Sequence, residues 1–130
     1  MPTTKEQTSN QPKSDVRKMS QEFSLKAIDL INELPNDSTS QYLSQNFLAS
    51  STSIGALLIE AKSAPSKEQF AEIFEQAFTK VNETKYWLTL IANTVKGKAE
   101  LAKELLDEAH IISKIIYASI QTLRGKRQAA

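Results

Sequence analysis

The apolar residues of this chain recur at intervals of three and four positions in four separate segments, which is the spacing of amphipathic helices. The first stripe extends from Val16 to Leu34, and the second extends from Leu43 to Ala61. The third stripe, from Phe70 to Val95, is the longest, and the fourth extends from Leu101 to Leu123. Helices of this kind bury their apolar stripes against one another, so the pattern predicts an all-α fold.

Short interruptions separate the four stripes and set the expected helix ends. Pro35 follows the first stripe, because a helix usually ends before a proline. Pro65 precedes Ser66, whose hydroxyl is suited to cap the third helix together with Gln69, and Gly97 is suited to end that helix. Connections this short make neighbouring helices antiparallel. The sequence therefore predicts an up-and-down antiparallel four-helix bundle rather than a fused coiled coil.

The chain of 130 residues is long enough for one domain. Residues 1–13 are polar, contain two prolines and lack an apolar period, so we expect a disordered N-terminal tail. Residues 14–125 are expected to form the bundle, and residues 126–130 a frayed C-terminal tail. Gly55 lies inside the second stripe, where glycine costs about 1 kcal/mol relative to alanine. It indicates either a close helix crossing or the approach of a partner.

The composition excludes several classes of protein. Because there is no cysteine, disulfides, thiolate zinc sites and cysteine nucleophiles are ruled out, and a reducing compartment is consistent with this absence. The net charge of +1 gives no overall attraction for nucleic acid. No segment has the length and apolarity of a membrane span, and the N-terminus lacks the apolar core of a secretory signal. We therefore expect a cytoplasmic protein without a membrane partner.

The titratable residues do not assemble into a recognisable catalytic or metal-binding pattern. Asp107 and His110 stand one helical turn apart, as in half of a carboxylate–histidine metal pattern, but a dinuclear site needs two such pairs. The chain has a single histidine, so a solvated helix face or an interface contact is expected there. No glycine-rich phosphate loop is present. The sequence predicts no catalytic residue, metal, cofactor or small-molecule substrate, and no enzyme activity.

Two linked motifs carry a resemblance to a known family. The first, SxxSIGAxxxEAxxAxSKxxF, occupies positions 50–70, and the second, ETxYWLxL, occupies positions 83–90. Together they resemble the bacterial four-helix bundle protein family, which includes proteins encoded in intervening sequences of 23S rRNA genes and accessory proteins of diversity-generating retroelements. The resemblance extends over roughly positions 20–126. Ala49, Leu57 and Ile59 depart from the arginine, asparagine and polar residue usual in the family, which argues against a charged groove on the second helix.

The resemblance implies several properties of this chain. Family members form up-and-down bundles that commonly self-associate, and pentamers are a known arrangement. Basic relatives from the retroelement branch bind nucleic acid and a reverse transcriptase. For most relatives no reaction is known.

The polar residues of the motifs have two possible roles. They are Ser50, Ser53, Glu60, Glu83 and Tyr86. One possibility is a network of hydrogen bonds that fixes the register of the second and third helices. The other is a ligand site or contact surface, and the sequence leaves both open.

The third and fourth helices carry more apolar positions than a narrow stripe requires. Excess apolar surface is usually covered by a partner, so we predict a homo-oligomer, with the pentamer favoured by the family resemblance. The expected interface residues are Phe74, Phe78, Trp87, Ile111 and Ile115. Deep packing of the fourth helix between two neighbours would explain the same pattern.

Two functions are consistent with these observations. The leading hypothesis is a non-enzymatic oligomeric bundle that acts as a scaffold or accessory subunit. The alternative is a nucleic-acid-binding accessory protein similar to the retroelement branch, with contacts from Lys114, Arg124, Lys126 and Arg127. Those cations would equally complement the negative end of a helix dipole.

Overall fold

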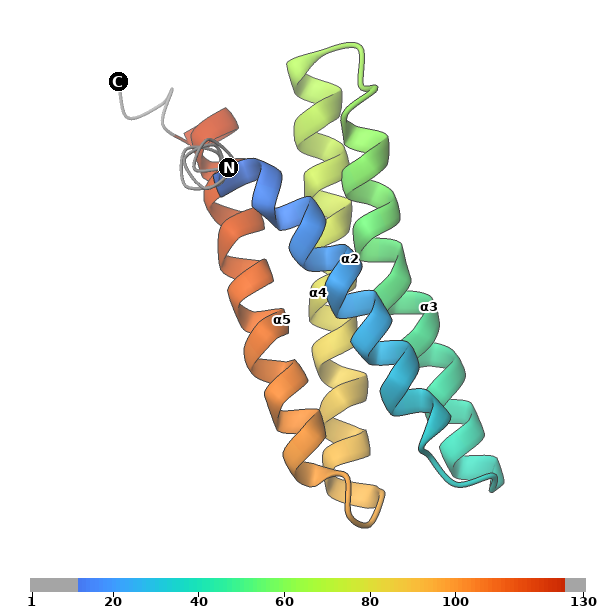
Figure 1. Cartoon of the computed structure of the whole chain (residues 1–130). Helices are drawn as coiled ribbons and strands as arrows, with labels where there is room; N and C mark the ends of the chain where they lie inside the picture. Colours follow the sequence, from blue (N-terminus) through green and yellow to red (C-terminus); the bar gives the residue numbers. More distant parts are fainter. Residues whose placement is uncertain (1–11, 126–130) are drawn as a thin grey trace, which may run out of the picture.

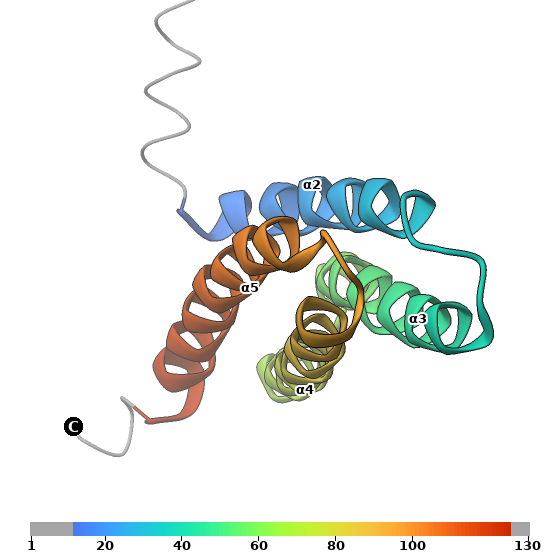
Figure 2. The same cartoon turned by 90° about the horizontal axis from the view of Figure 1, so that it is seen from below.

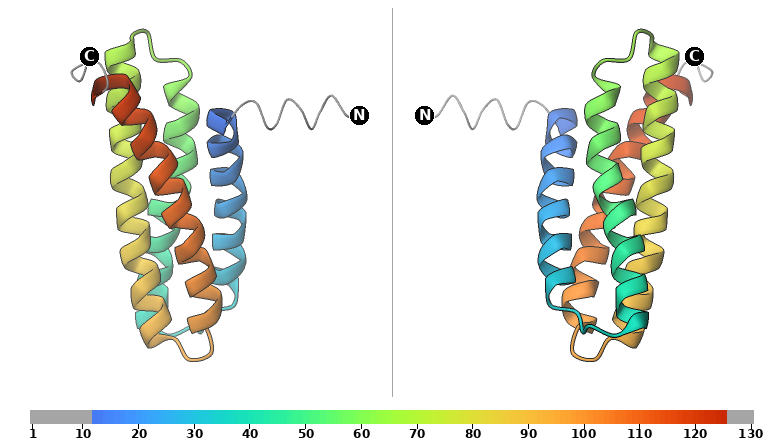
Figure 3. Two further views of the ribbon diagram at one scale, coloured as in Figure 1. Left: turned by 90° about the vertical axis from the view of Figure 1, so that its left-hand side faces the viewer. Right: turned by 90° about the vertical axis from the view of Figure 1, so that its right-hand side faces the viewer.

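The computed structural model describes residues 12–125, which form four long helices and no strand. The helices are α2 (Pro12–Asn32), α3 (Ser38–Ala61), α4 (Lys67–Thr94) and α5 (Ala99–Ile120), and α5 continues into a π-helical turn, η1 (Gln121–Gly125). The α3–α4 turn lies at one end of the bundle, and the α2–α3 and α4–α5 connections lie at the other (Figures 1 and 3). Successive helices are antiparallel, so the predicted up-and-down bundle is confirmed.

The four helices occupy the corners of a bundle, so each one packs against two others. Helix α4 packs closely against α3 and α5, and α2 packs against α3 and α5 on the opposite side. Viewed along the bundle, α2 lies across α5 and α3, with α4 at the far corner (Figure 2). Helix α2 therefore does not pack against α4, which lies diagonally across the bundle.

The helix ends follow the local signals of the sequence. The Asp37 carboxylate accepts a hydrogen bond from the Ser40 backbone N–H at 2.8 Å, and the Ser66 hydroxyl accepts one from the Gln69 backbone N–H at 3.1 Å. Each side chain satisfies a backbone donor that the first helical turn leaves unpaired. Gly97, with φ of +81°, reverses the chain after α4, in a conformation that favours glycine.

The first helix begins earlier than the sequence predicts. Helix α2 starts at Pro12, although positions 12 and 13 were expected to belong to the tail. Proline is compatible with the first turn of a helix because its missing N–H would have no partner there. The rest of the expected tails, residues 1–11 and 126–130, lie outside the described residues.

The core is built from the inner stripes of all four helices. Fully buried side chains include Phe23, Phe47, Leu88 and Ile112, one from each helix in turn. In the second stripe Leu58 is buried while Leu57 is only partly so. The spacing of three and four therefore predicted the buried face of each helix.

Gly55 lies on the α2 side of α3. A Cβ added there would meet the Ser20 Cβ at 3.8 Å, an ordinary van der Waals separation. The predicted close approach of two helices is thus present, but it leaves room for a methyl group.

Ion pairs join the helices at their rims. Lys26 of α2 lies 2.8 Å from Glu108 of α5, and this hydrogen bond raises the pKa of the Lys26 ammonium group. Lys98, in the connection between α4 and α5, lies 2.7 Å from Glu33 at the end of α2. None of the described helices is long and apolar enough to cross a membrane.

Candidate functional site

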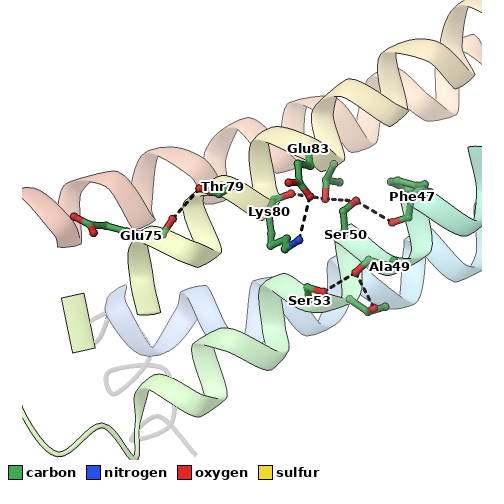
Figure 4. A network of polar contacts seen from close by, with 10 residues as sticks. Phe47, Ala49, Ser50, Ser53, Glu75, Thr79, Lys80 and Glu83 are labelled. Carbon is green, nitrogen blue, oxygen red and sulfur yellow. Dashed lines mark hydrogen bonds and ion pairs between the residues drawn. The ribbon is translucent and has the colours of Figure 1, made fainter. Parts of the chain in front are cut away.

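Helices α3 and α4 enclose a solvent-open hollow of about 680 Å³ near their midpoints, which we call the α3–α4 hollow. It lies where the two family motifs face each other (Figure 4). The lining residues are Asn46, Ala49, Ser50, Ser53, Thr79, Lys80, Asn82, Glu83, Tyr86 and Trp87. The hollow therefore gathers four of the five polar motif residues that the sequence singled out.

The floor of the α3–α4 hollow is a pair of buried hydroxyls. Thr84 Oγ1 lies 3.0 Å from Ser50 Oγ and 2.8 Å from the Lys80 carbonyl oxygen, and both side chains are buried. The Ser50 hydroxyl also donates to the Phe47 carbonyl at 3.3 Å. The bond between Thr84 and Ser50 joins the two helices and fixes the relative register of α3 and α4. The sequence did not identify Thr84, which lies within the third stripe, as the polar partner of Ser50.

The walls of the hollow present hydrogen-bond acceptors. The Ser53 hydroxyl donates to the Ala49 carbonyl at 2.7 Å, and the Thr79 hydroxyl donates to the Glu75 carbonyl at 3.2 Å. Serine and threonine in helices often bond one turn back in this way. Because each hydroxyl proton is used within its own helix, the oxygen lone pairs remain as acceptors.

Aromatic rings border the same hollow. Trp87 is partly buried and packs edge-on against Tyr86 of its own helix and Tyr42 of α3, with ring centroids 5.1 Å and 6.0 Å apart. Tyr42 and Tyr86 are 60% and 58% exposed. The sequence did not identify Tyr42, although it precedes the lining residue Asn46 by one helical turn.

Glu60 is the motif residue that the structure places apart from the others. It lines a second, smaller hollow of about 330 Å³ beside the α3–α4 turn, together with Gln69 and Glu72. The two hollows follow one another along the seam between α3 and α4. The five motif residues therefore lie along one seam, but only Ser50 takes part in a hydrogen bond between the two helices among the described residues.

The prediction that Phe74 belongs to an oligomer interface is wrong. Phe74 is only 3% exposed and stacks on Phe70 with ring centroids 4.7 Å apart, so it belongs to the core of a single chain. Phe78, Trp87 and Ile115 are partly buried against the core. Of the five residues, Ile111 is the most accessible, with 49% of its surface exposed.

An apolar surface that the sequence did not predict lies over α2 and α3. We call it the α2–α3 face, and its residues are Leu25, Ile28, Leu48 and Ile59. The Ser24 hydroxyl donates to the Ser51 carbonyl, and Ser20 lies opposite Gly55, so Ile28 lies close to Leu48 in this antiparallel register. Ile59 borders a hollow of about 580 Å³ between the same helices, which Arg17 and Gln21 also line. The sequence signal was an apolar pair, Leu25 and Ile28, outside the first stripe.

The predicted basic contacts are dispersed. Lys114 is exposed on α5, and Arg124 forms ion pairs of 3.3 Å with Glu68 and 3.4 Å with Glu75 on α4. Lys126 and Arg127 lie outside the described residues. Those pairs neutralise Arg124 and attach the end of α5 to α4.

The carboxylate–histidine pair of the fourth helix is open to solvent. Asp107 and His110 are both exposed on α5. Within residues 12–125 no three histidine or acidic side chains are grouped in a way that would hold a metal ion.

Comparison with known proteins identifies the family. The family model of the 23S rRNA-intervening sequence protein matches residues 12–118. A crystal structure of a protein with unknown function from the S23 ribosomal protein family, from Bacteroides thetaiotaomicron VPI-5482, superimposes with a TM-score of 0.76. The two sequences are 31% identical, over 82% of this chain and 98% of that one. The comparison with curated proteins gave no significant match. The match over nearly the entire bundle shows that the chain belongs to the 23S rRNA-intervening sequence protein family.

Proposed function

We propose that this protein is a non-enzymatic bundle subunit that assembles with copies of itself in the cytoplasm and serves there as a scaffold or accessory protein. The observation that carries the proposal is the α2–α3 face, where four large aliphatic side chains are 38–59% exposed. Large apolar side chains exposed on one face of a protein often mark a surface that a partner covers. A second copy is the occupant we propose, because family members commonly self-associate.

Burying the α2–α3 face would supply part of the free energy that stabilises an assembly. Fully burying a leucine or isoleucine side chain contributes about 1.5–3 kcal/mol, so removing the exposed half contributes about 1 kcal/mol for each residue. In an assembly with rotational symmetry each copy forms the same contacts, so these contributions recur at every interface. A pentamer is the copy number that the family resemblance favours.

Light scattering on the purified protein tests the proposal. We expect a mass that is a multiple of 14.5 kDa, and a mass of 14.5 kDa at all concentrations would refute self-association. The double variant Leu25→Glu, Ile28→Glu should reduce the mass to one subunit while the helical circular dichroism signal persists. Gln76→Glu, at an exposed position on the opposite helix α4, is the matched control and should leave the mass unchanged.

A second variant separates the two candidate interfaces. Ile111→Glu changes the exposed isoleucine of α5. This residue is the most accessible of the five that the sequence predicted for the interface. If this change dissociates the assembly and the α2 double variant does not, the interface lies on α5 and our assignment to the α2–α3 face is wrong.

We give the nucleic-acid alternative less weight. Among its described residues, Arg124 is already paired with two carboxylates and Lys114 stands alone on α5. A gel shift with structured RNA at low salt that weakens steeply as salt increases would reverse this preference, because such a dependence reports phosphate contacts.

A further inference from the structure

We propose that the α3–α4 hollow is a docking site for an arginine-bearing segment of a partner protein. In this proposal the guanidinium group lies against the aromatic border and pairs with the Glu83 carboxylate. The inference rests on the proposed accessory role, and it adds the chemistry of the partner that an assembly of these bundles would hold.

The hydrogen-bonding groups of the hollow suit a ligand that is rich in donors. The hydroxyls of Ser53 and Thr79 donate to carbonyls of their own helices, at 2.7 Å and 3.2 Å. The Asn46 amide also donates to the Tyr42 carbonyl, at 2.9 Å. The Ser53 and Thr79 hydroxyls therefore offer oxygen lone pairs to a ligand, and Asn46 offers its amide oxygen and a second N–H. A guanidinium group complements such a surface because it has five N–H donors and no acceptor.

The aromatic border of the hollow suits a cation. Trp87 provides the largest ring of the site, and its neighbours Tyr42 and Tyr86 are more than half exposed. Cations bind to the faces of aromatic rings, and tryptophan is the strongest partner for them. Arginine is favoured over lysine at such a border because its planar group stacks on a ring while its edge forms hydrogen bonds.

The charged side chains of the α3–α4 hollow form one weak ion pair. Lys80 is the single cation that lines the α3–α4 hollow, and it lies 3.2 Å from Glu83. Both side chains of this pair are more than a third exposed, so their attraction is weak. An arginine can replace the lysine with a two-point contact to the carboxylate.

The same seam continues toward the α3–α4 turn with further negative charge. Glu60 and Glu72 line the second hollow, and no lysine or arginine lines it. A single small cation would use one hollow only. An extended segment with basic residues uses both, which is why the occupant we propose is a peptide segment and not a free cation.

The single tryptophan of the chain gives a direct test. Trp87 fluorescence is recorded while the full-length protein is titrated with a blocked alanine peptide that carries two arginines. We expect a saturable change with peptide up to about 1 mM, the range of weak association. The same peptide with citrulline in place of arginine, which keeps the shape and removes the charge, should bind at least tenfold more weakly. A lysine peptide should bind several-fold more weakly.

Variants of the hollow provide the second arm. Glu83→Gln should weaken the arginine peptide about tenfold, whereas Glu104→Gln, at an exposed position on α5, is the matched control and should have no effect. Equal responses to the arginine and citrulline peptides, no saturable response, or unchanged affinity in Glu83→Gln would each overturn the inference. Light scattering on the same samples keeps the two proposals apart. An assembled protein that ignores the peptide contradicts only this inference, and a monomer that binds it contradicts only self-association.

Discussion

The hydrogen bond between Ser50 and Thr84 joins α3 to α4, and we predict how much its removal lowers the free energy of unfolding. The bond spans 3.0 Å, and its two side chains are only 4% and 0% exposed. Thr84→Val keeps the shape of the side chain and removes only the hydroxyl. A net intramolecular hydrogen bond contributes about 1 kcal/mol, and leaving a buried partner unpaired costs about 1–3 kcal/mol.

The expected effects of the single and double variants differ in a defined way. We expect Thr84→Val to destabilise the fold by about 1–2 kcal/mol, because it leaves Ser50 with only its long 3.3 Å bond to the Phe47 carbonyl. Ser50→Ala should cost about 1 kcal/mol or less, since Thr84 keeps its 2.8 Å bond to the Lys80 carbonyl. In the double variant neither partner is left unpaired. Its cost should therefore be smaller than the sum by about 1 kcal/mol.

Urea unfolding followed by far-ultraviolet circular dichroism measures these free energies. All variants are compared at one protein concentration, because self-association would couple stability to concentration. Ser53→Ala and Thr79→Val form the matched control cycle, since these hydroxyls bond only within their own helices and should be additive within about 0.5 kcal/mol. If the Ser50–Thr84 cycle is equally additive, the bond does not fix the register of the two helices and the reasoning is refuted.

Two further predictions concern the glycines and the core, and the same unfolding assay checks them. Gly97→Ala should destabilise the protein by about 1 kcal/mol, because the backbone φ of +81° at this position disfavours a Cβ. Gly55→Ala should be neutral or stabilising by up to about 1 kcal/mol, because the atom nearest to the added Cβ is 3.8 Å away. A reversed order of these two variants would contradict the backbone argument. Phe47→Ala should cost about 3–5 kcal/mol, since the side chain is fully buried, and a loss below about 1 kcal/mol would show that it does not support the core.

The helices and their ends were predictable because they depend on local physics. Periodic burial, the Ser66 cap and the reversal at Gly97 each involve residues within one turn of one another. Phe74 was assigned to the interface, although its spacing from Ala77 and Val81 continues the buried stripe of α4. That regular interval indicates that Phe74 belongs to the core. From the sequence it was assigned instead to the extra apolar residues of the third helix, outside the narrow stripe.

The candidate sites were less predictable because they depend on how whole helices are rotated and paired. The contact of Tyr42 with Trp87 joins residues that are far apart in sequence, and no periodicity reports it. In the same way Leu25 and Ile28 become part of one face only because α2 lies antiparallel to α3, close to Leu48. The motifs indicated which segments meet, but the rotation of each helix decides which side chains line a hollow.

Helix α3 connects the two proposed surfaces and keeps them apart. Asn46 and Ser53 line the hollow shared with α4, while Gly55 and Ile59 line the one shared with α2. Since successive helical residues differ by about 100° in direction, these two sets lie on opposite sides of the buried stripe. A second copy that contacts α3 only through the α2–α3 face would therefore leave the α3–α4 hollow open. An assembly of several copies would present as many hollows as subunits, and a partner with several basic segments would bind it far more tightly than it binds one subunit.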